Sequence, residues 1–231
     1  MMVNNIINDF NRAIIVDERY KFILEGVKNT LLISVVSVII GVIIGVLVAA
    51  INAYHKETKK IKIISKICDL YVTIIRGTPV LLQLMIMYYV VFRTIRDINL
   101  IFVSALAFGI NSGAYVSEII RAGIESIDKG QMEAGRSLGL TYFQTLKLVI
   151  LPQAIKNVLP TIGNEFITLI KETSVAGYIG VRDLTKASDI IASRTYNYFF
   201  PLIIAAIIYL TIILALTKCL NIFERRLKQN A

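Results

Sequence analysis

The sequence is poor in charged residues and in the side chains that bind metals. Only 18% of its 231 residues are Asp, Glu, Lys or Arg, whereas an ordinary soluble domain carries about 25%. There is one histidine, His55, and the two cysteines, Cys68 and Cys219, lie far apart in the sequence. The composition argues against a soluble globular protein and offers no ligand cluster for a metal. We interpret both cysteines as small buried hydrophobic residues.

Long apolar runs take the place of the missing charge. Three windows contain no charged residue, namely Leu31–Ile51, Ile98–Ser117 and Asn197–Thr217. Each has about 20 residues, which is enough for a helix to cross the hydrocarbon core of a membrane. Two weaker windows, Ile67–Phe92 and Val158–Ile179, contain charged residues and prolines. The sequence therefore predicts an all-α integral membrane protein with five transmembrane helices.

The net charge of +9 could indicate nucleic-acid binding, but its distribution indicates a membrane orientation instead. With the N-terminus outside, 14 Lys and Arg residues fall in inner segments and 9 in outer ones. Inner loops of membrane proteins are enriched in Lys and Arg. We therefore predict an outer N-terminus and an inner C-terminus, and no nucleic-acid partner.

The segments outside the spans have characters of their own. Residues 1–25 place isoleucines and Phe10 at near-helical spacing between charges, which predicts a helix lying on the outer membrane interface. They do not resemble a cleavable signal peptide. No repeat or linker divides the chain, so 1–231 is predicted to be one membrane domain. The pairs Gly41-x3-Gly45 and Gly109-x3-Gly113 predict close helix contacts, within the subunit or between subunits.

A polar segment at about 125–152 carries the most informative motif. It contains Glu133-Ala134-Gly135-Arg136-Ser137-Leu138-Gly139 and, ten residues later, Val149-Ile150-Leu151-Pro152. The stretch from Gly130 also fits G-x4-G-[KR]-S, but Arg136 replaces the phosphate-binding lysine and no buried strand precedes it. We therefore predict no ATP site in this chain. The motif resembles the EAA-x3-G-x9-I-x-L-P cytoplasmic loop of ABC importer membrane subunits, with Gly135 and Val149 as conservative departures.

The resemblance extends from about residue 22 to 228 and indicates the polar amino acid branch of these permeases (the glutamine, histidine and arginine type). It rests on Ile75-Arg76-Gly77-Thr78-Pro79 with Gln83, on Asn111-Ser112-Gly113-Ala114-Tyr115 with Glu118, and on Asn164-Glu165-Phe166-Ile167 through Lys171-Glu172-Thr173-Ser174. It implies a bacterial inner-membrane permease without enzymatic activity. The implied partners are ATP-binding cassette ATPase subunits, which bind ATP and Mg, a second permease subunit (identical or different), an extracellular substrate-binding protein and membrane lipid.

In that family the cytoplasmic loop docks on the ATPase. The residues expected to couple this chain to the ATPase are Glu133, Ala134, Gly135, Arg136, Gly139, Leu151 and Pro152. A plain surface connector is the alternative, but it would not need the apolar run from 142 to 151. A helix over 131–138 would present Glu133 and Arg136 on one face, and Gly139 would allow a sharp exit.

Polar residues at membrane depth are costly and normally face a cavity or a partner. On this ground we predict that the substrate is bound by Asn111, Ser112, Tyr115, Glu118, Asn164, Glu165 and Thr168. Glu165 is expected to meet the ammonium group of the substrate or to make a structural hydrogen bond. Glu118 could instead pair with Arg121 one turn away, and we interpret Arg76 as an interfacial or intersubunit anchor more readily than as a ligand.

An acidic path favours cations, which predicts arginine, lysine or histidine as cargo. The principal alternative is an ATP-independent secondary transporter or channel that uses the same carboxylates. Five spans without an inverted repeat argue against many such folds. A scaffold or sensor subunit that recruits a signalling protein is a third hypothesis.

Overall fold

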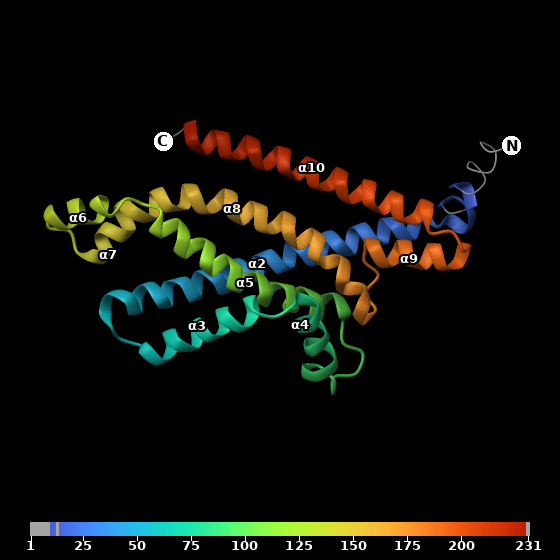
Figure 1. The fold of residues 1–231 in the computed structure, drawn as a ribbon, viewed down its shortest axis with the longest axis horizontal. Helices are drawn as coiled ribbons and strands as arrows, with labels where there is room; N and C mark the ends of the chain where they lie inside the picture. Colours follow the sequence, from blue (N-terminus) through green and yellow to red (C-terminus); the bar gives the residue numbers. More distant parts are fainter. Residues whose placement is uncertain (1–9, 13, 230–231) are drawn as a thin grey trace. The chain divides into compact units, whose positions relative to one another are not determined.

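The computed structural model describes residues 10–12 and 14–229, and within these the regular elements are all helical (Figure 1). The α-helices are α2 (Tyr20–Thr58), α3 (Lys62–Arg76), α4 (Val80–Ile86), α5 (Leu100–Glu125), α6 (Lys129–Ser137), α7 (Tyr142–Thr145), α8 (Leu151–Glu172), α9 (Leu184–Thr195) and α10 (Phe199–Gln229). Short 3₁₀ segments occupy Val16–Glu18 and Thr173–Ile179, and π-helical turns occupy Met87–Val91 and Leu146–Ile150. The all-α prediction is confirmed for the described residues.

Three helical stretches are long and apolar enough to cross a membrane: Val16–Thr58, Leu100–Glu125 and Phe199–Leu227. They contain all or nearly all of the three charge-free windows of the sequence. A bent pair, Lys62–Arg76 with Val80–Val91, counts as a fourth candidate span if its two halves are taken together. The predicted count of five spans and the predicted orientation stay predictions.

The predicted second span is interrupted by Gly77, Thr78 and Pro79. Helix α3 ends at Arg76, α4 begins at Val80, and the two axes are bent by 109°. Proline has no N–H to donate, and the residue before it is driven out of the helical region. An interruption was expected at this point, and the structure shows that it is a complete break between two helices.

The boundaries of the predicted fourth span, Val158–Ile179, were wrong at both ends. Helix α8 already begins at Leu151, and Pro160 lies inside it instead of marking its start. The chain leaves the α-helix after Glu172 and continues as a 3₁₀ segment. Hydropathy alone could not locate these ends, because the first two turns of α8 are amphipathic.

The predicted interfacial helix over 1–25 lies partly outside the described residues, since 1–9 and 13 are not described. In the described part, Asp17 and Glu18 have positive φ angles and α2 begins at Tyr20. Residues 20–25 thus belong to the first long helix. Cys68 is buried as expected, whereas Cys219 is exposed on α10.

The chain divides into two compact units, and α2, α5, α8 and α10 each contribute to both. Unit 1 comprises Met1–Ser37, Pro79–Phe108 and Ile167–Leu216, and unit 2 comprises Val38–Thr78, Gly109–Phe166 and Thr217–Ala231. The single-domain assignment stays a prediction. The two units are described separately below.

Unit 1 is organised around the start of α9, which packs on the first turns of α2. The backbone N–H of Leu184 donates to Thr30 Oγ1 at 3.2 Å, and Asn29 Nδ2 donates to the carbonyl oxygen of Arg182 at 2.9 Å. A side chain at Gly26 would collide with the backbone of Leu184, 2.8 Å from the ideal Cβ position. Leu184 is completely buried in an apolar cluster with Ile23. These contacts hold α9 against α2.

Asp183 caps α9 from a fully buried position in unit 1. Its Oδ1 accepts from the backbone N–H groups of Thr185 and Lys186 at 2.7 and 3.2 Å, while Oδ2 has no hydrogen-bond partner among the described residues. Burial raises the pKa of this carboxyl group to about 6, and the backbone donors only partly oppose the shift.

Unit 2 depends on a close approach of α2 and α5. Ideal Cβ atoms at Gly41 and Gly45 would lie 2.7 Å from Ser112 Oγ and 2.6 Å from Val116 Cγ1. At Gly113 a Cβ would lie 2.7 Å from Ile44 Cγ2. Small residues allow helix backbones to approach closely in a membrane. For Gly41, Gly45 and Gly113, the structure shows a contact within the subunit.

Helix α3 is fastened to the same unit by polar contacts. Ser65 Oγ donates to Asn52 Oδ1 at 2.9 Å, and Asn52 Nδ2 donates to Asp69 Oδ1 at 2.8 Å. Tyr71 Oη donates to the backbone oxygen of Ile110 on α5 at 2.6 Å. These bonds place the C-terminal end of α3, with Arg76, beside the second half of α5.

Because the pKa of Asp183 is higher in the folded than in the unfolded chain, the folded state binds this proton more tightly. We expect its contribution to stability to be present below about pH 4 and lost as pH rises through about 6. Thermal unfolding of the detergent-solubilised protein should therefore show a decline over this range that Asp183→Asn reduces. Asp189→Asn, which removes a half-exposed carboxylate paired with Lys186, should leave the decline intact; a decline equal in wild type and Asp183→Asn would contradict the assignment.

Candidate functional site

Helix α6 is built as a short, rigid element by its own terminal hydrogen bonds. At its start, Asp128 is the N-cap and its side chain accepts from the backbone N–H of Gly130 at 2.6 Å. At its end, Gly139 N–H donates to the oxygen of Arg136 and Leu140 N–H to that of Gly135, at 3.0 and 3.1 Å. This pair of bonds is a Schellman motif, which needs a left-handed residue after the helix. Gly139 provides it with φ of +87°.

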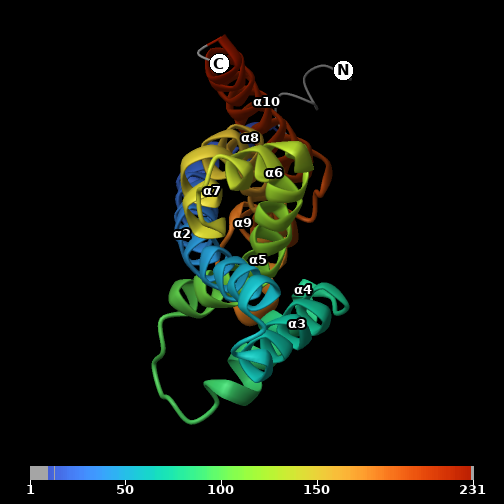
Figure 2. The ribbon, with the colours of Figure 1, turned by 90° about the vertical axis from the view of Figure 1, so that its left-hand side faces the viewer.

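The next element, α7, is equally well defined. Thr141 and Gln144 form a capping box, in which each side chain accepts from the other's backbone N–H. Helices α6 and α7 therefore lie next to each other as two capped pieces joined by a glycine turn (Figure 2). The predicted loop helix with a sharp exit at Gly139 is confirmed.

The first departure from the family pattern is Gly135 in place of the second alanine of EAA, and its packing explains it. It is the buried residue of α6, and an ideal Cβ there would lie 2.4 Å from Cγ2 of Thr145, which is itself completely buried. The alanine found in the family pattern could not be placed here without moving Thr145. The glycine and the threonine side chain thus fit together as the seat of α6 on the following segment.

Apart from the half-buried Met132, the remaining residues of α6 face solvent. Glu133, Ala134 and Arg136 are exposed, and the structure shows no ion pair or hydrogen bond from the Glu133 and Arg136 side chains to any described residue. Leu138, at the C-cap, is 84% exposed. A capped helix that exposes two charged side chains without ion pairs and one leucine is typical of a surface that contacts a partner.

Leu151 and Pro152 lie at the junction with α8. The π-helical turn Leu146–Ile150 precedes them, and α8 begins at Leu151. Because Pro152 cannot donate a backbone hydrogen bond, an uninterrupted α-helical ladder cannot pass through this point, which favours the widened turn. The Leu-Pro pair therefore sets the geometry of the joint, while Pro152 itself is exposed.

A second group of predicted residues lies where α5 faces α8 in unit 2. Ser112 is fully buried, and its Oγ donates to Glu165 Oε1 at 3.0 Å. Asn111 is also buried, at 3% exposure, whereas Asn164 is exposed. Thr168 lies on the next turn of α8 but belongs to unit 1. The structural hydrogen bond considered for Glu165 is present, and the role of these residues as ligands stays a prediction.

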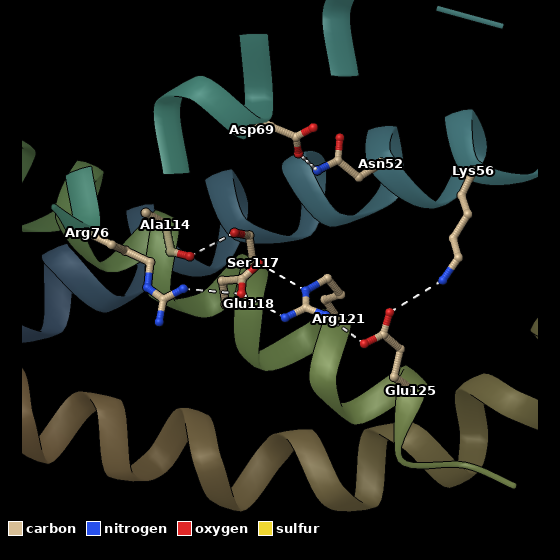
Figure 3. A network of polar contacts seen from close by, with 9 residues as sticks. All are labelled: Asn52, Lys56, Asp69, Arg76, Ala114, Ser117, Glu118, Arg121 and Glu125. Atoms are coloured by element: carbon tan, nitrogen blue, oxygen red, sulfur yellow. Dashed lines mark hydrogen bonds and ion pairs between the residues drawn. The ribbon is translucent and has the colours of Figure 1, made fainter. Parts of the chain in front are cut away.

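A network of charged groups runs along the second half of α5 (Figure 3). Arg121 donates to both carboxylate oxygens of Glu118, at 3.1 and 2.9 Å, and to Glu125 Oε2 at 2.6 Å. Arg76 of α3 also reaches Glu118, at 3.2 Å, and Lys56 of α2 reaches Glu125 at 3.4 Å. The pairing of Glu118 with Arg121 is therefore confirmed.

The structure divides the predicted substrate residues into two groups. Ser112 and Glu165 are in direct contact, whereas Tyr115 and Glu118 line a separate cavity of about 500 Å³ in unit 2. The Arg76 guanidinium lies over the Tyr115 ring, 5.4 Å from its centroid. Sequence reasoning did not assign Arg76 or Asn157 to this cavity. The i, i+4 spacing of Asn157 with Thr161, a polar position of the predicted fourth span, was the available signal for Asn157.

The long apolar helices define a helical membrane protein, with a capped, exposed helix α6 and a polar contact between α5 and α8. The sequence comparisons make this specific. The chain belongs to the family of binding-protein-dependent transport system inner membrane components, which matches residues 41–229. Its homologues are permease subunits and are not enzymes themselves, because the ATPase of such systems lies in a separate subunit.

Named relatives and solved structures agree with this assignment. The arginine transport system permease protein of Bacillus subtilis is 44% identical over 210 residues, covering 90% of this chain and 94% of that protein. A Rickettsia bellii protein that carries the name of a glutamine transport system permease is 42% identical over 207 residues, covering 89% and 93%. A crystal structure of an amino acid ABC transporter with histidines aligns with a TM-score of 0.83 at 43% identity, covering 90% and 94%. An inward-facing methionine ABC transporter, with a TM-score of 0.75 and 20% identity over 90% and 97%, shows the fold alone.

The fit of Gly135 against Thr145 can be tested by substitution. We expect Gly135→Ala to destabilise the protein by about 1–3 kcal/mol, as overpacked substitutions do. Removing the opposing methyl group in Gly135→Ala/Thr145→Ser should restore most of the loss, and the exposed Ser137→Ala should be neutral. Thermal unfolding in detergent measures all three, and a single variant as stable as wild type would show that the contact is not tight.

Proposed function

We propose that this chain is the membrane permease subunit of an ATP-driven amino acid importer in the bacterial inner membrane. It would form half of the translocation path and couple through α6 to a separate ATPase subunit. The observation that carries the proposal is that α6 is capped at both ends and exposed to solvent, in a chain that belongs to a binding-protein-dependent transport family. ATP and Mg would be bound by the ATPase partner, and a second permease copy or homologue would complete the path.

The construction of α6 supports the coupling role. Its ends are closed by Asp128 and by the turn at Gly139, so it can transmit a displacement without unwinding. Its exposed residues, Glu133, Arg136 and Leu138, offer two charges and an apolar contact to a groove on a partner. The buried face at Gly135 ties it to α7, and through the π-helical turn to α8. Helix α8 carries Glu165.

The substrate is proposed to be a polar amino acid. Relatives carry names for arginine and for glutamine transport, and the similar solved transporter was crystallised with histidines. Glu165 is the candidate for the ammonium group or for a cationic side chain, because the hydrogen bond found for it among the described residues comes from the neutral Ser112. Glu118, in contrast, is neutralised by Arg76 and Arg121.

This arrangement weakens the expectation of an acidic path. Among the ion pairs of the described residues, Glu118 has two cationic partners and Glu165 has none. Preference for cationic cargo is therefore proposed to rest on Glu165 alone. An extracellular binding protein would deliver the cargo. The family match does not favour an ATP-independent transporter or channel.

Coupling predicts a specific defect in variants of α6. We expect Glu133→Ala and Leu138→Ala to lower the ATPase stimulation by the binding protein about tenfold, while membrane insertion and yield stay normal, because interface contacts of this kind contribute about 1–2 kcal/mol each. The measurement is ATP hydrolysis by the complete complex in proteoliposomes. Glu57→Ala, an exposed carboxylate at the end of α2, is the control. Normal stimulation in both α6 variants would refute coupling through this helix.

The cargo assignment predicts a change in selectivity. We expect Glu165→Gln to reduce arginine uptake about tenfold relative to glutamine uptake, because a charge-assisted bond contributes about 1.5–3 kcal/mol. Paired uptake measurements with both labelled amino acids, made with the same binding protein for wild type and variant, compare the two ratios, so that the selectivity of the binding protein cancels. The isosteric glutamine can still accept from Ser112, which limits disturbance of α5. An unchanged ratio would refute cationic preference at Glu165 but not the permease assignment.

A further inference from the structure

The cavity of about 500 Å³ in unit 2 contains more cationic than anionic side chains, although Tyr115 and Glu118 were predicted to bind a cationic substrate. It is lined by polar residues of three helices, namely Arg76 from α3, Tyr115, Glu118 and Arg121 from α5, and Asn157 and Thr161 from α8. Two guanidinium groups therefore face one carboxylate. With the partners outside the lining included, Glu125 and Lys56, the network has three cationic groups and two carboxylates, and this net positive charge favours an anionic group over a cationic one.

Within the cavity, Glu118 and Arg121 already satisfy each other. Both oxygens of Glu118 accept from Arg121, and the Arg121 Nη1 donates to Glu125 outside the cavity lining. All three nitrogens of the Arg121 guanidinium are therefore engaged. A ligand would have to break this arrangement to bind at Arg121.

Arg76 differs from Arg121 in having donors to spare. It uses one of its nitrogens, Nη1, for the 3.2 Å bond to Glu118 Oε2, and no other hydrogen bond from its guanidinium group is found among the described residues. The central carbon of the group lies over the Tyr115 ring, 5.4 Å from its centroid. The side chain is 44% exposed. A planar guanidinium with free donors binds a carboxylate through two parallel hydrogen bonds.

We infer that Arg76 is the receptor for the α-carboxylate of the amino acid in this cavity, at a site distinct from the Ser112–Glu165 contact. The inference rests on the proposed function. Asn157 supports it, because its Nδ2 donates to Ser126 and its Oδ1 is left to accept from an ammonium group. Every α-amino acid carries this carboxylate, so Arg76 would hold the part that all such cargo shares.

The same chemistry could come from a lipid, since a phosphate oxygen also suits a guanidinium group near a membrane surface. The experiment must therefore separate the carboxylate of an amino acid from a lipid phosphate. It must also remove the extracellular binding protein, whose own selectivity would hide that of the permease.

The test is equilibrium binding to the co-purified permease–ATPase complex in maltoside detergent, without the binding protein. The probes are L-arginine and L-argininamide, and L-glutamine and L-glutaminamide, because each amide lacks only the carboxylate charge. We expect wild type to bind each acid at least about tenfold more tightly than its amide, since charge-assisted hydrogen bonds contribute about 1.5–3 kcal/mol. Arg76→Gln should reduce the ratio to within about threefold, and Arg76→Lys should give an intermediate value.

Arg182→Gln is the matched control. Arg182 also makes one ion pair, at 2.7 Å to Glu25, and also lies over an aromatic ring, that of Phe22 at 5.0 Å. Its side chain is 40% exposed, close to the value for Arg76, but it belongs to unit 1. The acid-to-amide ratio of this variant should equal that of wild type. If Arg76→Gln does not yield a folded complex, Arg76→Lys is used as the test variant. It keeps the positive charge but lacks the two parallel N–H donors of the guanidinium group.

Four results would overturn the inference. An unchanged acid-to-amide ratio in both Arg76 variants excludes a carboxylate contact there. An unchanged ratio together with less co-purified phospholipid phosphate assigns Arg76 to a lipid headgroup. Failure of wild type to bind either acid, with no ATPase co-purifying, would remove the proposed function as well. A changed arginine-to-glutamine uptake ratio in Glu165→Gln with an unaffected Arg76 ratio would leave the proposed function standing and reject only this site.

Discussion

The close approach of α2 and α5 is the contact on which unit 2 depends. It exists because Gly41 and Gly45 leave no side chain between the backbone of α2 and the residues Ser112 and Val116. In a membrane, where apolar side chains gain little by leaving lipid, such close packing is one of the main sources of helix association. Helix α5 then supplies Ser112 to one polar contact and Tyr115, Glu118 and Arg121 to another.

The second constraint is that charges within an apolar helix must be compensated. Glu118 and Arg121 are one turn apart on α5 and neutralise each other, and Arg76 and Lys56 join from α3 and α2 (Figure 3). Each ion pair replaces solvation that the membrane cannot supply. The network thereby links three helices of unit 2, and it leaves unused donors at its Arg76 end.

Much of the architecture could be read from the sequence, but the site could be read only in part. The apolar windows, the break at Pro79 and the loop helix were predictable because span length, proline chemistry and glycine turns are local properties. The start of α8 at Leu151 was missed because an amphipathic first turn looks like a loop in a hydropathy profile. The pairing of Arg76 with Glu118 joins residues 42 positions apart, and no local pattern reports such a contact. The tight fit at Gly135 was likewise visible only as a departure from the family pattern.

The π-helical turn before Pro152 fixes the angular phase of α8. In an α-helix each residue advances the side chains by about 100° around the axis, so one residue gained or lost in this turn would rotate the whole of α8 relative to α5. The turn in its present form brings Glu165 to Ser112. If the turn became regular α-helix, α8 would rotate, Glu165 would no longer face Ser112, and a neighbouring residue of α8 would take its place. The rotation of α8 about its own axis therefore depends on whether this turn is π-helical or α-helical, so it changes in a step and not gradually.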